Sequence, residues 1–214
     1  MEGERLFFKS QGLLLEGLIC RSDGKEAVVV THPHPLYGGD MHNNIVESLV
    51  RAYRQKGYTT LRFNFRGVGR SEGVHDNGTG EREDVKAAVG YLCEEGKSEI
   101  DLAGYSFGAW VGVQGVEELA EVKRVIMVSP PVDFIDFSHL KYSPKIRLVI
   151  AGSEDDIASP ATIEKMLPEW NRDARFEVVQ GADHFYWGKT DELEEILEDY
   201  LPSVTKVKPR SMTF

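Results

Sequence analysis

The stretch Ile100–Val113, IDLAGYSFGAWVGV, decides the fold that we predict for this chain of 214 residues. It opens with an apolar run typical of a buried strand and closes with small residues typical of a closely packed helix. Between them lies Gly104–Gly108, GYSFG, with a glycine two places before and two places after Ser106. Such glycines leave room for a serine held in a strained turn. The stretch therefore predicts a strand that turns sharply into a helix, with Ser106 at the turn.

Short β-branched runs alternate with amphipathic segments along the rest of the chain. This alternation is typical of an α/β fold, in which helices cover both faces of a mostly parallel, twisted sheet, here of about eight strands. Strands are expected over Leu13–Ile19, Ala27–Thr31, Thr59–Phe63, Ile100–Tyr105, Arg124–Ser129, Arg147–Ala151 and Arg175–Val179, with an antiparallel edge over Glu4–Lys9. Helices are expected over Asn43–Lys56, Glu81–Glu94, Phe107–Glu118, Pro160–Trp170 and Asp191–Tyr200.

The composition, with 41% hydrophobic and 28% charged residues, is typical of one globular domain. We expect that domain to span residues 1–214, with a loose tail over about residues 204–214. The net charge of −10 argues against binding to a phosphate backbone, so no nucleic-acid partner is expected. The chain shows neither a leader pattern nor an apolar run of bilayer length, which predicts a cytoplasmic protein without a membrane span. Cys20 and Cys93 are interpreted as reduced thiols.

Ser106 has the sequence context of a nucleophile. A helix that begins at the turn points its first N–H groups at the place where negative charge develops on a reacting carbonyl. The backbone N–H of Phe107 is therefore expected to form half of an oxyanion hole. The alternative is an ordinary serine at the start of a helix, and the position of the motif between an apolar strand and a helix favours the nucleophile.

An acidic loop follows the strand expected at Arg147–Ala151. A serine in this kind of turn takes its partners in the chain order Ser, then Asp or Glu, then His. Asp155 best matches the expected spacing after Gly152, and Asp156 is the second candidate. The alternative is that these acids form a solvated loop before the next helix.

His184 is the histidine that follows Asp155 in the sequence, in the loop GADHF after the last expected strand. The glycine of this loop lets the chain turn and bring an imidazole toward the serine. The alternative is a loop histidine packed by Phe185 and Trp187. Together, Ser106, His184 and Asp155 predict a triad that attacks an acyl carbonyl, forms an acyl-enzyme and hydrolyses it.

A metal site is not expected. His32 and His34 stand at alternate positions, but no cysteine or carboxylate cluster near them completes a ligand set. The glycine-rich segment FNFRGVGRSEG lacks the lysine of a phosphate-binding loop and is interpreted as a strand exit at the rim of the site. No cofactor is expected.

Several motifs together resemble a known family. HPHPLYGG at 32–39, FRGVGRSEG at 65–73, GYSFG, GSEDD at 152–156 and GADHF resemble the small, lidless α/β-hydrolases related to dienelactone hydrolases, over nearly the whole chain. The resemblance implies an α/β-hydrolase fold with no cap or a minimal one. Dienelactone hydrolases themselves use a cysteine where Ser106 stands, so that particular activity is not expected.

The resemblance also implies that the second oxyanion donor lies in the loop HPHPLYGG. Many relatives carry His-Gly before the donor residue. With His34-Pro35 in that place, the donor is Leu36, and Tyr37 is the alternative.

The interval PPVDFIDFSHLKYSPKI, at 130–146, is too short for an independent lid. We therefore expect an open, shallow site that takes short or medium acyl esters, with thioesters and small amides as alternatives of the same class. Its walls are expected to be Leu36, Tyr37, Phe107, Phe134, Phe137, Phe185, Tyr186 and Trp187.

Two further classes of function stay open. One is a non-catalytic or mainly binding member of the fold, and the other is an acyltransferase or perhydrolase that uses the same triad. The presence of all three triad residues favours a carboxylesterase-like enzyme acting on a small-molecule acyl substrate. A monomer and a homodimer fit the sequence equally.

Overall fold

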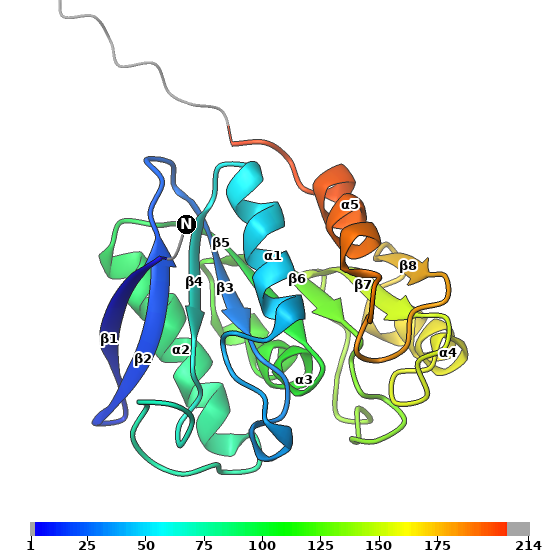
Figure 1. The fold of residues 1–214 in the computed structure, drawn as a ribbon, viewed down its shortest axis with the longest axis horizontal. Helices are drawn as coiled ribbons and strands as arrows, with labels where there is room; N and C mark the ends of the chain where they lie inside the picture. The colour runs from blue at the N-terminus through cyan, green and yellow to red at the C-terminus, as the bar shows by residue number, and fades with distance from the viewer. Residues whose placement is uncertain (1–2, 205–214) are drawn as a thin grey trace, which may run out of the picture.

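The computed structural model describes residues 3–204, which form an eight-stranded sheet flanked by helices (Figure 1). The strands lie in the order β1-β2-β4-β3-β5-β6-β7-β8. Their bounds are β1 Glu4–Ser10, β2 Leu13–Cys20, β3 Glu26–Thr31, β4 Thr59–Phe63, β5 Glu99–Tyr105, β6 Val122–Val128, β7 Ile146–Gly152 and β8 Arg175–Val179. Strand β2 runs antiparallel to both of its neighbours, and the strands from β4 to β8 are parallel. The predicted fold class and the antiparallel edge are confirmed.

The two faces of the sheet hold separate hydrophobic cores. In β3, Ala27 and Val29 belong to one core, while Val28 and Val30 belong to the other. Successive side chains of a strand point to opposite faces, so a strand buried on both sides is apolar throughout. This is why the strand candidates contain continuous apolar runs rather than an alternation with polar residues.

Helices cover both faces of the sheet, as predicted. Helices α1 and α5 lie on one face, and α2, α3 and α4 pack into the core of the other (Figure 1). Their bounds are α1 Asn44–Gln55, α2 Thr79–Glu94, α3 Phe107–Val113, α4 Pro160–Trp170 and α5 Thr190–Tyr200.

The helix predicted over Phe107–Glu118 is shorter in the structure. Helix α3 ends at Val113, Gln114 is extended, and Gly115 has a left-handed φ of 72° before a short 3-10 turn, η2, at Val116–Glu118. Glycine reaches a left-handed conformation without steric cost, so it interrupts the helix here. The apolar periodicity continues across the break, which is why the sequence predicts one helix.

The segment between β6 and β7 forms turns and bends with no helix, so no cap covers the sheet there. Among residues 3–204, no helix is both long enough and apolar enough to cross a membrane. The predicted loose tail begins at Val204, whose N–H donates to the Lys56 carbonyl at 2.7 Å. The rest of that tail lies outside the described residues.

Candidate active site

The turn between β5 and α3 holds Ser106 in a strained backbone conformation. Its φ is 54° and its ψ is −121°, a backbone conformation that residues other than glycine rarely adopt. A Cβ at Gly108 would lie 2.6 Å from the His32 carbonyl oxygen, and one at Gly104 would lie 2.6 Å from the Ala109 backbone. Both motif glycines are therefore required by close backbone contacts, and they leave Ser106 at the carboxyl edge of the sheet.

We expect Gly104→Ala to lower the free energy of unfolding by about 1–3 kcal/mol, because the added methyl collides with backbone that packing holds in place. The midpoint of urea unfolding measures this loss. Gly90→Ala in α2 is the matched control, because a Cβ at Gly90 meets no atom within 4 Å. That variant is expected to gain about 0.5–1 kcal/mol from the higher helix propensity of alanine. Equal effects of the two substitutions would contradict the close-contact argument.

A chain of hydrogen bonds joins Ser106, His184 and Asp155. The Ser106 Oγ lies 2.9 Å from His184 Nε2, and His184 Nδ1 lies 2.9 Å from Asp155 Oδ2. All three residues are buried. The carboxylate accepts a hydrogen bond from Nδ1–H, which leaves Nε2 as the acceptor for the serine hydroxyl. The structure thus brings together the three residues that the sequence singled out.

Asp155, not Asp156, faces the imidazole. The Asp155 Oδ1 also accepts hydrogen bonds from the N–H groups of Ile157 and Ala158, at 2.9 and 2.8 Å, whereas Asp156 is exposed. Burial raises the pKa of Asp155, but hydrogen bonds from His184 and the loop outweigh it, so the pKa lies below its usual value. The acid therefore remains ionised and fixed in orientation.

The loop that carries His184 is anchored to the sheet. The Tyr105 hydroxyl donates to the His184 carbonyl at 2.7 Å. A Cβ at Gly152 would lie 2.2 Å from the Ala182 carbonyl oxygen, so this glycine lets the loop close against the end of β7. These contacts set the backbone of His184 within reach of the turn at Ser106.

In the loop after β3, hydrogen bonds within a turn engage both N–H groups that the resemblance implies as oxyanion donors. The Leu36 N–H donates to His34 Nδ1 at 3.2 Å and the Tyr37 N–H donates to the His34 carbonyl at 3.1 Å, because Pro35–Tyr37 form a 3-10 turn, η1. Both expected donors are thus used within the turn. The His34 N–H has no acceptor among residues 3–204, and its ring lies 4.7 Å from that of Phe107. This geometry favours the N–H groups of His34 and Phe107 as candidate oxyanion donors.

Hydrogen bonds hold His32 in place at the start of this loop. His32 directly follows β3 and is fully buried. His32 is also engaged through both ring nitrogens: Nε2 accepts from the Phe65 N–H at 3.0 Å, and Nδ1 lies 2.7 Å from the Pro33 carbonyl. Burial lowers the pKa of His32 to about 4, so the ring is neutral.

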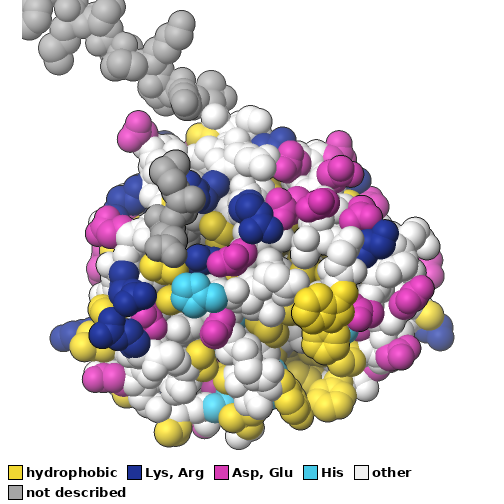
Figure 2. All heavy atoms as spheres, viewed as in Figure 1, with side chains coloured by type: hydrophobic (Ala, Val, Ile, Leu, Met, Phe, Trp, Pro, Cys, Tyr) yellow, Lys and Arg dark blue, Asp and Glu magenta, His cyan; other side chains and the backbone are white. Residues whose placement is uncertain are grey.

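A cavity of about 430 Å³, which we call the elbow cavity, opens above Ser106. Four predicted wall residues line it, namely Tyr37, Phe107, Phe134 and Phe185. The side chains in its lining that sequence reasoning missed include those of His34, Asn43, Ile135 and Ile157. Figure 2 shows hydrophobic side chains gathered over the loop between β8 and α5, where Phe185 and Trp187 are exposed.

The other predicted walls lie elsewhere. Phe137 is 3% exposed and packs against Trp170, with ring centroids 5.4 Å apart. Tyr186 is fully buried, and its hydroxyl pairs with that of Ser129 at 2.9 Å. Leu36 and Trp187 are exposed, but their side chains are outside the lining of the elbow cavity. Hydrophobicity alone does not distinguish a wall from a core residue, because long-range packing decides which aromatic side chains are covered.

The elbow cavity is electrically neutral. Within residues 3–204, no Lys, Arg, Asp or Glu side chain lines it. Burial, together with the nearby His75, lowers the pKa of His34. Its imidazole is thus a neutral part of the wall at neutral pH. In the same described range, no group of three or more His, Cys, Asp or Glu side chains is arranged to hold a metal ion.

A mostly parallel sheet with a strained serine between a central strand and a helix defines the class of α/β-hydrolase folds. The model of the alpha/beta hydrolase family matches residues 28–148, more than half of the chain. An uncharacterized protein of Rickettsia prowazekii is 34% identical over 212 residues, covering 94% of this chain and 89% of the relative. The chain belongs to the alpha/beta hydrolase family.

Two solved structures are similar over nearly their whole length. One, described as an alpha-beta serine hydrolase homologue from Coxiella burnetii, has a TM-score of 0.86 and 35% identity, covering 94% of this chain and 98% of that one. The other, from Xanthomonas campestris, is described as a serine hydrolase without a lid, with a TM-score of 0.85 and 29% identity. It covers 96% of this chain and 98% of its own. The resemblance noted from the motifs is confirmed.

Proposed function

We propose that this protein is a carboxylesterase-like serine hydrolase that cleaves short or medium esters with an uncharged acyl group. The observation that carries the proposal is the buried hydrogen-bond chain from Ser106 through His184 to Asp155. A serine is a weak nucleophile until a base takes its proton. In this hydrogen-bond chain, His184 is the base and Asp155 is the group that orients it.

The proposed reaction has two halves. The Ser106 Oγ attacks the ester carbonyl while its proton passes to His184 Nε2, and the N–H groups of Phe107 and His34 stabilise the oxyanion. His184 then donates that proton to the leaving alkoxide, and the alcohol departs from an acyl-enzyme. In the second half, water attacks the acyl carbon with His184 as base, and the carboxylic acid is released as Ser106 regains its proton. Asp155 keeps the proton on Nδ1 and stabilises the imidazolium in both halves.

The walls of the elbow cavity support an apolar, uncharged acyl group. Aromatic and aliphatic side chains such as Phe134, Ile135 and Phe185 line it, and its volume of about 430 Å³ suits an acyl chain of short or medium length. Because no cap covers the mouth, the leaving group extends into solvent and is held less closely than the acyl group. Thioesters and small amides fit the same geometry.

A serine-reactive fluorophosphonate tests the proposed nucleophile. We expect one adduct per chain, located on Ser106 by peptide mapping, because phosphorus is attacked by the same activated oxygen. The Ser106→Ala variant is the control and should remain unlabelled. Absence of an adduct on the folded wild-type protein would favour a non-catalytic member of the fold over the esterase.

A matched pair of esters tests the neutrality of the acyl site. A 4-methylumbelliferyl butyrate should be hydrolysed with a kcat/KM at least about 100-fold higher than the corresponding hemisuccinate, because the carboxylate of the latter meets no cation in the cavity. Equal rates for the two esters would exclude the proposed selectivity.

Product analysis with added alcohol or peroxide separates hydrolysis from acyl transfer and perhydrolysis, which share the acyl-enzyme.

A further inference from the structure

The two candidate oxyanion donors differ in how firmly the fold holds them. Phe107 is the first residue of α3 and is buried, and its ring packs against those of Phe65 and Trp110, with centroids 6.0 and 5.6 Å apart. His34 lies in the loop after β3 and is only half-buried. The position of its backbone N–H therefore depends on what its side chain contacts.

The ring of His34 packs against two aromatic rings from other parts of the chain. Its centroid lies 4.7 Å from that of Phe107 and 4.9 Å from that of His75. The rings of His75 and Phe107 are 5.6 Å apart, so His75 packs against the side chains of both candidate donors. A further ring, that of Tyr37, is 5.0 Å from His34, but it is exposed and belongs to the same loop. The anchors of His34 are therefore Phe107 and His75.

His75 is itself held against α2. Its side chain is 11% exposed, and its Nδ1 lies 2.8 Å from Oε1 of Glu81, which is fully buried in the first turn of the helix. The same carboxylate accepts hydrogen bonds from the N–H groups of Asp76 and Gly78, at 2.9 and 2.8 Å. Hydrogen bonds to a carboxylate are among the stronger ones in proteins, so Glu81 fixes the whole segment that carries His75.

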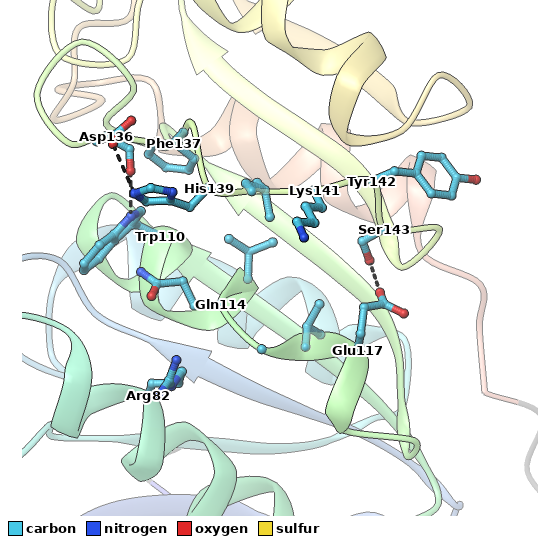
Figure 3. A pocket seen from close by; sticks show the side chains of 14 residues that line it. Arg82, Trp110, Gln114, Glu117, Asp136, Phe137, His139, Lys141, Tyr142 and Ser143 are labelled. Carbon is cyan, nitrogen blue, oxygen red and sulfur yellow. Dashed lines mark hydrogen bonds and ion pairs between the residues drawn. The ribbon is translucent and has the colours of Figure 1, made fainter.

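Trp110 closes the other end of this segment. A Cβ at Gly78 would lie 2.2 Å from Trp110 Cζ3, so the indole packs directly on the Gly78 backbone. Figure 3 shows this indole at the wall of a cavity of about 340 Å³, where its N–H donates to the Asp136 carbonyl at 3.3 Å. The indole is fixed both at its N–H and at its six-membered ring, and it holds the segment against α3.

The ring of His75 acts by packing rather than by hydrogen bonding. Although Nδ1 is close to Glu81, neither ring nitrogen has a hydrogen-bond partner among residues 3–204. Removal of the ring leaves a gap beside His34, and a loop that loses a buried contact gains freedom to move. A different aromatic ring at position 75 should fill the same space.

We propose that His75 is a positioning residue for the oxyanion hole, in a series of contacts that runs from α2 through His75 to His34. Its ring keeps the His34 N–H beside that of Phe107, where both can stabilise an oxyanion. The inference rests on the proposed hydrolase function, which gives these N–H groups their role. His75 is outside the lining of the elbow cavity, so it acts through His34 rather than on the substrate.

His75→Ala is expected to lower kcat for 4-methylumbelliferyl butyrate by about 10- to 100-fold and to leave KM within about threefold, because a displaced oxyanion donor weakens binding of the transition state. His75→Phe restores a ring and should keep kcat within about threefold of the wild-type value. Val74→Ala is the matched control, since Val74 is the neighbouring residue and its side chain is exposed. Urea unfolding checks that all three variants fold.

A pair of ketone inhibitors separates positioning from a general loss of structure. The Ser106 Oγ adds to the carbonyl carbon of a butyl trifluoromethyl ketone, its proton passes to His184, and the carbonyl oxygen becomes an anion in the oxyanion hole. The butyl methyl ketone has the same chain but resists this addition. In His75→Ala, the inhibition constant of the first ketone should rise by the factor by which kcat/KM falls, and that of the second should stay unchanged.

Backbone ¹⁵N relaxation tests the contact without a substrate. The order parameter of the His34 N–H should be about 0.85 in the wild-type protein and should fall toward about 0.6 in His75→Ala. That of Phe107 should stay unchanged, because α3 holds it independently.

The inference is overturned if His75→Ala leaves kcat or the His34 order parameter unchanged, if both ketones lose affinity equally, or if His75→Phe loses as much activity as His75→Ala. Failure of the proposed function gives a different result, namely a wild-type protein without esterase activity and without an adduct on Ser106. The order parameter still decides in that case whether His75 holds His34.

Discussion

Ser106→Ala is expected to lower kcat for ester hydrolysis by about 10⁴- to 10⁶-fold, the largest effect of any single substitution in this protein. Without the hydroxyl, no acyl-enzyme forms. His184 is still a base, but the serine nucleophile that it would activate is absent. The remaining rate comes from the oxyanion donors and from substrate binding alone. Hydrolysis of 4-methylumbelliferyl butyrate measures the loss directly.

The same variant should fold normally. The Ser106 hydroxyl is bonded to His184 and to no structural partner among the described residues, so its removal leaves the packing of β5 and α3 intact. Circular dichroism and the unfolding midpoint serve as controls. Activity close to that of the wild-type protein, with the fold unchanged, would exclude Ser106 as the nucleophile.

Asp155→Asn is expected to lower kcat by about 10⁴-fold. The amide oxygen can still accept the N–H groups of Ile157 and Ala158, which leaves its NH₂ facing His184 Nδ1. An NH₂ donor there places the imidazole proton on Nε2, where it faces Ser106 and prevents the ring from acting as a base. The size of the effect thus comes from the tautomer rather than from a displaced side chain.

Asp156→Asn is the matched control for this substitution. Asp156 is adjacent in sequence and has the same charge, but it is exposed, and the hydrogen bonds to His184 Nδ1 come from Asp155. Its replacement should leave kcat unchanged. If the two variants ranked in the reverse order, the orienting role would belong to Asp156.

The lowered pKa of Asp155 also predicts how stability depends on pH. Because its carboxylate is more acidic in the folded protein than in the unfolded chain, it stabilises the fold above the unfolded pKa, and this contribution is lost as the pH falls through the folded pKa. The wild-type protein should therefore exceed Asp155→Asn in free energy of unfolding at neutral pH. That difference should shrink on acidification, as measured by urea unfolding at a series of pH values.

Much of the fold could be predicted from local pattern. Strands buried on both faces are continuous apolar runs, and the helices between them carry apolar residues on one side, so the predicted and observed bounds of most elements agree within two residues. The exception is the helix after Ser106, where Gly115 ends a periodic apolar pattern that otherwise continues. Such a break depends on the conformation that the surrounding structure imposes on the glycine.

The sequence by itself determined the class of fold and the three candidate catalytic side chains. A strained turn requires glycines at set positions, and parallel strands bring their carboxyl ends to one edge of the sheet. Only the tertiary structure showed which N–H groups after β3 are engaged. The turn at Pro35–Tyr37 uses those of Leu36 and Tyr37 internally and leaves that of His34 without an acceptor among residues 3–204. The tertiary structure also decided which aromatic side chains line the elbow cavity. Phe137 and Tyr186 are aromatic like Phe134, but residues distant in sequence cover them. Hydrogen bonds and burial of this kind depend on contacts between distant segments, which no local pattern encodes.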